Sequence, residues 1–177
     1  EEKVVGRFPL NEAYSFLICS PTGIARELLH RIKYEGRSDL AYYLGRIYGA
    51  ELLRDNIKID VDYVVPVPLH WKRRWRRGYN QAACFAQGVA DIQQLRLYLH
   101  GLIRHSHTTT QTRKTRFERW NRMDGQFIWN KKITLDGARI LLVDDVITTA
   151  STLSSCAEAT LKAGASRVGL LTLAVVR

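Results

Sequence analysis

The chain has 177 residues, 46% of them hydrophobic, which is enough to bury a core of ordinary size, and we expect one globular domain over residues 1–177. Its formal net charge of +10 at neutral pH indicates anionic partners, such as phosphates, pyrophosphate, nucleotides or nucleic acid. No apolar run approaches the roughly 20 residues that span a bilayer, and no secretory segment opens the chain, so neither a membrane protein nor a secreted one is expected.

The first third of the chain predicts one strand and two helices. Residues 1–23 are weakly patterned, with a candidate strand over 11–18. Apolar residues at helical spacing over 24–32 predict a helix. Lys33 and Tyr34 follow it and could line a pocket, although a solvated helix end is the simpler interpretation. A second helix begins after residue 38, with these side chains on one face: Leu40, Tyr43, Leu44, Ile47 and Tyr48.

A strand, a basic run and a helix follow over residues 63–91. Residues 63–65 predict a strand that Pro66 ends, because proline cannot continue a central ladder. The basic run over residues 69–81 is interpreted as a polar turn. The helix after it spans residues 81–91, with Ala82, Phe85, Ala86 and Val89 inward. A strand that leads into a turn and a helix is the topology that places ligands at the carboxyl ends of strands.

The basic run has two other interpretations, which the residues leave open. It could be a solvated charged face, or a patch that binds nucleic acid. Trp71 and Trp75 lie between its lysine and arginine residues, and such a mixture fits base stacking combined with phosphate contacts.

A long polar segment separates two short strands in the second half of the chain. The first strand lies around residues 99–103, with Arg104 at its exit, and the second spans residues 127–129. Residues 106–121 between them are rich in threonine and arginine and poor in apolar residues. Connections of this length inside a compact domain are usually functional lids or disordered segments.

The most informative stretch covers residues 140–152. Four apolar residues, 140–143, predict a strand buried on both faces, as in parallel sheets. The adjacent carboxylates of Asp144 and Asp145 lie at its carboxyl end, and a hydroxyl-rich turn and a helix follow. The N–H groups at the start of a helix favour phosphate, whereas carboxylates suit sugar hydroxyls or a hydrated divalent cation. A sugar phosphate would satisfy both halves of the stretch.

Residues 140–152 resemble the phosphoribosyl-pyrophosphate (PRPP) signature of the type I phosphoribosyltransferases, although Ala150 stands where that family usually has glycine. The resemblance implies that Asp144 and Asp145 hold the ribose hydroxyls and a substrate-bound Mg²⁺. The residues that it implies for the 5′-phosphate are Thr148, Thr149, Ala150, Ser151 and Thr152. The alternatives are an ordinary buried strand before a capped helix, and a receiver domain, for which too few residues follow Asp145.

Residues 65–69 (Val-Pro-Val-Pro-Leu), with Arg-Gly-Tyr-Asn-Gln at 77–81, are similar to the pyrophosphate loop of the ComF/GntX-like branch of this fold. The resemblance implies that the backbone amides of 67–70 hold pyrophosphate, often around a cis peptide bond. The pyrophosphate residues implied are Val67, Pro68, Leu69, His70, Arg77 and Gly78.

The polar segment is similar to the mobile catalytic hood of the same branch. The similarity rests on Arg104, Thr108, Gln111 and Arg119, and it implies that Arg104 is catalytic together with Asp144 and Asp145. Arg122 stands where that branch commonly has asparagine.

The sequence therefore predicts an α/β fold of the type I phosphoribosyltransferase kind, with a mainly parallel central sheet, flanking helices and a mobile hood. The implied activity is Mg²⁺-dependent transfer of phosphoribosyl from PRPP, or a related ribose-5-phosphate compound, to an unidentified acceptor. The alternatives are a non-catalytic PRPP or nucleotide binder, and a competence-related protein whose basic face contacts single-stranded DNA. A homodimer is compatible with the resemblance. The zinc ribbon that such proteins typically carry is not found in these 177 residues.

Cysteine usage bears on the location of the protein. The three cysteines, Cys19, Cys84 and Cys156, are far apart and form no Cys-x-x-Cys motif. This pattern favours neither a disulfide framework nor a zinc site. We therefore expect the protein in a reducing cytoplasm.

Overall fold

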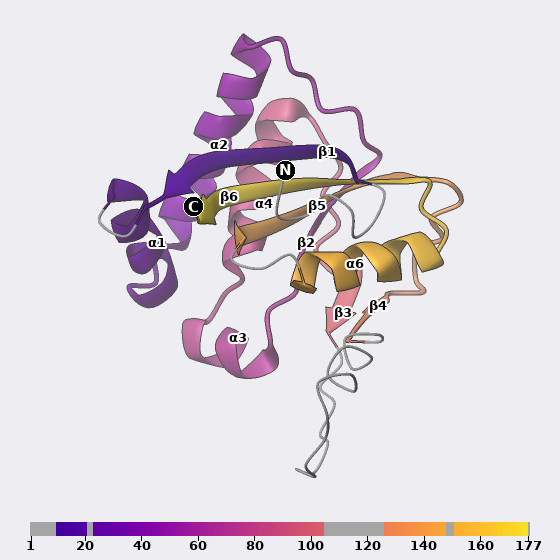
Figure 1. Cartoon of the computed structure of the whole chain (residues 1–177). Helices are drawn as coiled ribbons and strands as arrows, with labels where there is room; N and C mark the ends of the chain where they lie inside the picture. Colours follow the sequence, from indigo (N-terminus) through magenta and orange to yellow (C-terminus); the bar gives the residue numbers. More distant parts are fainter. Residues whose placement is uncertain (1–9, 21–22, 105–125, 148–150, 177) are drawn as a thin grey trace.

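A parallel sheet forms the centre of the fold, in a computed structural model that describes residues 10–20, 23–104, 126–147 and 151–176 (Figure 1). The described elements, in chain order, are β1 (Leu10–Cys19), α1 (Ile24–Tyr34), α2 (Ser38–Arg54), β2 (Tyr63–Pro66), α3 (Trp71–Arg77), α4 (Gln81–Gln93), β3 (Leu102–Arg104), β4 (Phe127–Trp129), β5 (Arg139–Ile147), α6 (Ser151–Lys162) and β6 (Arg167–Val176). The strand order is β1-β6-β5-β2 with every pair parallel, and β3 and β4 form a separate antiparallel pair. The predicted α/β class with a mainly parallel sheet is confirmed.

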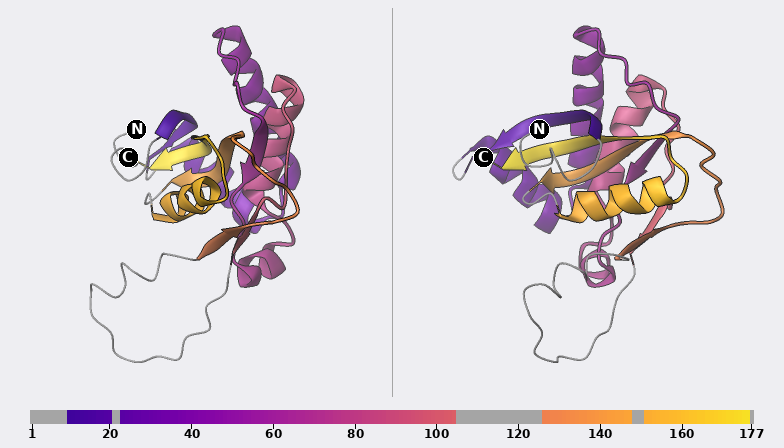
Figure 2. Two further views of the ribbon diagram at one scale, coloured as in Figure 1. Left: turned by 90° about the vertical axis from the view of Figure 1, so that its right-hand side faces the viewer. Right: turned by 45° about the vertical axis from the view of Figure 1, so that its right-hand side comes forward.

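The middle of β5 is buried on both faces of the sheet. Ile140 and Leu142 pack with side chains of α6, β3 and β4, whereas Leu141 and Val143 pack with side chains of α1, α2 and α4. Figure 2 shows α6 on one side of the sheet and α2 and α4 on the other. All four side chains have 0% exposure, and burying each contributes about 1.5–3 kcal/mol. The prediction of a doubly buried strand is confirmed.

Helices α2 and α4 cross in close contact at Gly45 and Gly88. A Cβ added at Gly88 would lie 2.1 Å from the backbone oxygen of Tyr42. The buried residues of α2 are Ala41, Leu44, Gly45, Tyr48, Gly49 and Leu52. Tyr43 and Ile47, which helical spacing places on the predicted face, are exposed, so the buried face is narrower than the spacing indicated. The small residues set the contact face, because they let the two backbones approach.

Two segments differ from their predicted form. The basic run contains the helix α3, not only a turn, and none of its side chains is buried, so no apolar pattern marks it. Its ends define it: His70 Nδ1 accepts a hydrogen bond from the Lys72 N–H at 3.3 Å, and Gly78 closes it with a φ of 78°. The other segment is β5, which continues past its carboxylates to Ile147 because β6 pairs with it that far.

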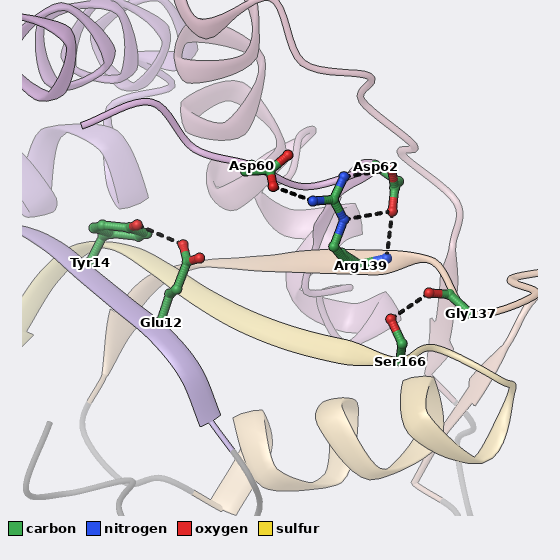
Figure 3. Close-up of polar contacts among 7 residues, drawn as sticks. All are labelled: Glu12, Tyr14, Asp60, Asp62, Gly137, Arg139 and Ser166. Atoms are coloured by element: carbon green, nitrogen blue, oxygen red, sulfur yellow. Dashed lines mark hydrogen bonds and ion pairs between the residues drawn. The ribbon is translucent and has the colours of Figure 1, made fainter. Parts of the chain in front are cut away.

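Polar contacts join the amino ends of β5 and β2 (Figure 3). The N–H of Arg139 donates to Asp62 Oδ2 at 2.7 Å, and its guanidinium donates to both Asp62 oxygens at 3.1 and 3.2 Å and also to Asp60. These hydrogen bonds lower the pKa of Asp62 below its ordinary value. Asp60 and Asp62 therefore have a structural role at the end of the sheet remote from Asp144 and Asp145.

No helix among the described residues is long and apolar enough to cross a membrane.

Candidate ligand site at the carboxyl edge of the sheet

The acid pair, Asp144 and Asp145, lies near the carboxyl end of β5. Each carboxylate accepts a hydrogen bond from the next backbone N–H: Asp145 N–H donates to Asp144 Oδ1, and Val146 N–H donates to Asp145 Oδ1, both at 2.8 Å. On the β2 side, the Val67 N–H bonds the Val143 carbonyl at 2.8 Å. Beyond that bond, β6 is the only described strand that pairs with β5. One side of the strand at the acid pair is thus free of a neighbouring strand within the described part of the chain.

Strand alternation directs the two carboxylates to opposite faces of the sheet. Asp145 faces α1, and Asp144 faces the side of α6 and β3, where its charge acts on Cys156 and Arg104. Burial, and then the negative charge of Asp145, raise the pKa of Asp144 well above its ordinary value. A carboxylate held in this way gains from any ligand that supplies hydroxyl donors or positive charge.

Lys33 is the counter-ion of the acid pair. Its Nζ lies 3.2 Å from Asp145 Oδ2, and the two side chains are only 22% and 16% exposed. The interpretation of Lys33 as a solvated helix end is therefore wrong. The Tyr79 hydroxyl donates to the carbonyl of Ile32 and so ties the last turn of α1 to the start of α4. Sequence alone gives no signal for this pairing, because Lys33 and Asp145 meet only once α1 packs on the sheet.

We expect Lys33→Met to raise the pKa of Asp144 further, because the Lys33 ammonium favours the charged form of that carboxyl. Methionine keeps most of the apolar stem, so packing should change little. Titration of the aspartate carboxyl carbons by NMR would measure the effect. Lys58→Met, at an exposed position before β2, is the matched control. An unchanged titration of Asp144 in Lys33→Met would contradict the proposed counter-ion.

Arg104 lies at the end of β3, with its guanidinium carbon 5.2 Å from the centre of the Phe127 ring. Burial, and then the positive charge of Arg73, lower the pKa of Arg104, whereas Asp144 acts in the opposite direction. Its Nε is buried and has no hydrogen-bond partner among the described residues. The structure thus brings Arg104, predicted from the family resemblance, toward Asp144, and leaves it a donor for an anionic ligand.

The predicted pyrophosphate segment is only partly free to bind with its amides. The Val67 N–H is already bonded to Val143, and Pro68 has no N–H. The prediction that the backbone nitrogens of residues 67 and 68 donate to pyrophosphate is therefore wrong. Within the described part of the chain the N–H groups of Leu69 and His70 have no partner. The described residues contain no cis peptide bond, so the cis bond that the resemblance implies is not present among them.

Arg77 is the last residue of α3, and Gly78 is its C-cap. The Arg77 guanidinium donates to Gln81 Oε1 at 3.1 Å, and its central carbon lies 5.7 Å from the centre of the Tyr34 ring. Its Nε is buried without a partner in the described part of the chain. Arg77 therefore lies against the end of α1, the helix that also supplies Lys33.

The remaining predicted site residues fall partly outside the described chain. Ser151 and Thr152 form the first turn of α6, as the helix prediction requires. The predicted residues outside the described ranges are Thr148, Thr149, Ala150, Thr108, Gln111 and Arg119. The ligand roles of both groups stay predictions.

Relatives share most of this chain. It is 30% identical over 144 residues to the DNA utilization protein YhgH of Escherichia coli K12, covering 80% of this chain and 63% of that protein. It is 36% identical over 115 residues to Competence protein F of Haemophilus influenzae, covering 63% and 49%. It is 30% identical over 151 residues to Competence protein ComFC of Bacillus subtilis, covering 84% and 58%. The chain thus spans less than two thirds of the length of these relatives.

Solved structures share the fold. The phosphoribosylpyrophosphate amidotransferase of B. subtilis, complexed with ADP and GMP, superposes with a TM-score of 0.53 at 17% identity, over 81% of this chain and 30% of that one. An allosteric regulatory enzyme of purine biosynthesis gives 0.51 at 20% identity, over 75% and 25%. Residues 80–177 match the family described as "Phosphoribosyl transferase domain". With its carboxylates, β5 and α6 all inside that match, the chain belongs to the phosphoribosyl transferase domain family.

Proposed function

We propose that this protein binds PRPP at the acid pair and transfers its phosphoribosyl group to an acceptor, with release of pyrophosphate. The observation that carries the proposal is the pair of adjacent carboxylates at the carboxyl edge of a parallel sheet, where Lys33 forms an ion pair with Asp145 and the charge of Arg104 acts on Asp144. Carboxylates suit ribose hydroxyls, and cations suit pyrophosphate, so one sugar pyrophosphate uses both. A cytoplasmic location is part of the proposal, since all three cysteines are free thiols.

Each part of the ligand has proposed protein partners. Asp144 and Asp145 hold the ribose hydroxyls. The 5′-phosphate lies at residues 148–152, where the start of α6 supplies N–H groups. Pyrophosphate receives the N–H groups of residues 69–70 and the charge of Arg77.

In the transfer, the nucleophilic atom of the acceptor bonds to C1 of the ribose while the bond from C1 to the pyrophosphate oxygen breaks. The electron pair of that bond leaves with pyrophosphate, and a proton on the nucleophile is lost to water. Positive charge develops on the sugar, where the acid pair stabilises it, and negative charge develops on the leaving group, where Lys33 and Arg104 stabilise it.

Magnesium fits this set of donors. The described residues hold no group of three or more His, Cys, Asp or Glu side chains that could bind a metal alone. Mg²⁺ characteristically takes one or two carboxylates and completes its shell with substrate oxygens and water, which Asp144 and Asp145 allow. When bound, it would act as a Lewis acid on the pyrophosphate oxygens.

Calorimetric titration with PRPP and Mg²⁺ tests the ligand separately from the acceptor. We expect saturable binding with one site per chain, and pyrophosphate release when a suitable acceptor is added. Binding without release for any acceptor would favour the alternative of a non-catalytic PRPP-binding protein. No heat of binding at millimolar PRPP would contradict both.

Single-stranded DNA is a second candidate ligand, which the surface of α3 favours. Trp75 is 87% exposed and Trp71 is 59% exposed, and between and beside them lie Lys72, Arg73, Arg74, Arg76 and Arg77. Exposed aromatic rings among cations can stack bases while the cations contact phosphates. Relatives named for DNA utilization and competence agree with this candidate.

We expect Trp75→Ala to weaken binding of an oligo-dT strand by roughly tenfold, the loss of one stacked base. Fluorescence anisotropy at one fixed salt concentration would measure it. Tyr43→Ala, which removes an exposed ring on the remote helix α2, is the control. Equal affinity for DNA in the two variants would exclude α3 as the stacking surface, and PRPP binding should be unchanged in both.

A further inference from the structure

A cavity of about 510 Å³ lies between α3, α4 and β3. Its walls are largely apolar and aromatic, and two arginines border it. The lining residues that matter here are Trp71, Tyr79, Leu99, Leu102, Arg74 and Arg104. Cavities of roughly 300–1,000 Å³ with apolar walls and a few polar groups are typical of small-molecule sites. The proposed PRPP site does not account for this one.

The cavity borders the proposed PRPP site, because its lining includes Arg104 and three residues of the predicted pyrophosphate segment, Pro68, Leu69 and Gly78. Leu69 lines the cavity, and its N–H is one of the two left for pyrophosphate. Arg104 lines the cavity too, and its charge acts on Asp144. A molecule in the cavity would therefore be the neighbour of a sugar held by the acid pair, which is the position that an acceptor requires.

The walls favour a planar ring. The Tyr79 hydroxyl is engaged with the Ile32 carbonyl, which fixes the orientation of its ring. The Trp71 indole offers a second aromatic face. Aromatic rings that pair with each other gain more than the area that they bury accounts for, so flat aromatic ligands gain most from this cavity.

The charges favour an anion. Arg74 and Arg104 contribute positive charge, and no aspartate or glutamate is among the described lining residues. The buried Nε of Arg104 has no partner among the described residues, and a buried donor without a hydrogen bond is unfavourable. A carboxylate oxygen is a suitable acceptor, because an arginine binds it through charge-assisted hydrogen bonds.

We infer that this cavity binds a planar aromatic carboxylate of one or two rings, and that such an acid, when it also carries a ring or amino nitrogen with a proton, is the acceptor class of the proposed transfer. The nitrogen bonds to C1 of the ribose while the bond from C1 to the pyrophosphate oxygen breaks, and it loses its proton to water. The acceptor assignment rests on the proposed function, whereas binding of the acid to the cavity does not. The ring lies against Trp71 and Tyr79, and the carboxylate meets Arg74 and Arg104.

Matched acids and amides test the inference by calorimetry, without PRPP. Benzoate and 2-naphthoate are compared with benzamide and 2-naphthamide. We expect each acid to bind more tightly than its amide. Arg74→Gln should weaken acid binding by about fivefold and leave amide binding unchanged. Arg96→Gln, which removes an exposed charge outside the cavity lining, is the control. Equal affinity for acid and amide would overturn the inference.

A filling variant tests the place of binding. Ala83 lines the cavity from α4 and is partly exposed, so Ala83→Phe should occupy the space without entering the core. Naphthoate binding should fall at least about tenfold, because the ring no longer fits, and a thermal melt verifies that the variant is folded. Undiminished naphthoate binding in the folded variant would place the acid elsewhere and overturn the inference. PRPP titrated into the same variant tests the proposed function independently.

Discussion

Replacing Asp144 by asparagine is expected to weaken PRPP binding by roughly 10- to 100-fold, the loss of one or more charge-assisted hydrogen bonds to ribose. The substitution nearly preserves size, and asparagine can still accept the backbone hydrogen bond from Asp145. What it removes is the negative charge that the sugar and its metal ion need. Titration with PRPP and Mg²⁺ measures the loss directly.

The same substitution should make the folded chain more stable at neutral and alkaline pH. The pKa of Asp144 is raised in the folded state, so the folded chain holds this proton more tightly than the unfolded chain does. In the unfolded chain this carboxyl has a pKa of about 3.9. The stability linked to this group is fully present below that value and is lost as pH rises toward the folded pKa. Asparagine does not ionise, so the variant does not lose this part of its stability as pH rises. Thermal unfolding at pH 4 and pH 8 should show a gain that grows with pH.

Asp136→Asn is the control for both measurements. Asp136 is exposed, with a φ of 38° that asparagine also tolerates, so ligand binding and stability should both stay unchanged. If Asp144→Asn bound PRPP as tightly as Asp136→Asn, the assignment of the sugar to the acid pair would fail.

Gly88→Ala is expected to cause the largest loss of stability from a single methyl group. Its Cβ would lie 2.1 Å from the Tyr42 oxygen and 2.8 Å from the Arg46 nitrogen, both backbone atoms of α2. The helices would have to move apart, and overpacking of this kind typically costs about 1–3 kcal/mol, or more where backbone must shift. The higher helix propensity of alanine offsets at most about 1 kcal/mol. We expect a net loss of about 2 kcal/mol in urea unfolding.

Gly49→Ala provides a graded comparison at the same contact between α2 and α4, from the α2 side. There the nearest atoms are the Ile92 Cβ at 3.1 Å and the Val89 oxygen at 3.3 Å, so small adjustments can make room. Its loss should be clearly smaller than that of Gly88→Ala. Similar values for the two would mean that the crossing is more adaptable than its geometry indicates.

Sequence patterns predicted the sheet well because burial leaves a direct mark on them. The apolar run of β5 and the inward side chains of α4 are buried as expected. Helix α3 left no such mark, since none of its residues is fully buried and only His70 and Gly78 define its ends. Periodicity reports which side of an element faces the core, and an element without a buried side is invisible to it.

The site was predictable only where its residues are contiguous. Asp144 and Asp145 could be recognised together because they lie in one short run. Lys33 could not, because its partner is more than 100 positions away and packing alone unites them. The amide of Val67 was misassigned for a related reason: a short motif does not tell which N–H groups the neighbouring strand has already taken.

The opposite orientations of Asp144 and Asp145 have a consequence for motion. Asp144 faces the layer that contains α6, where its charge acts on Cys156, and Asp145 forms an ion pair with Lys33 of α1. A single sugar bound by both carboxylates would link the two helical layers at the carboxyl edge of the sheet. Neither layer could then open without the other. Amide hydrogens of α1 and of α6 should then slow their exchange with solvent together when the ligand binds.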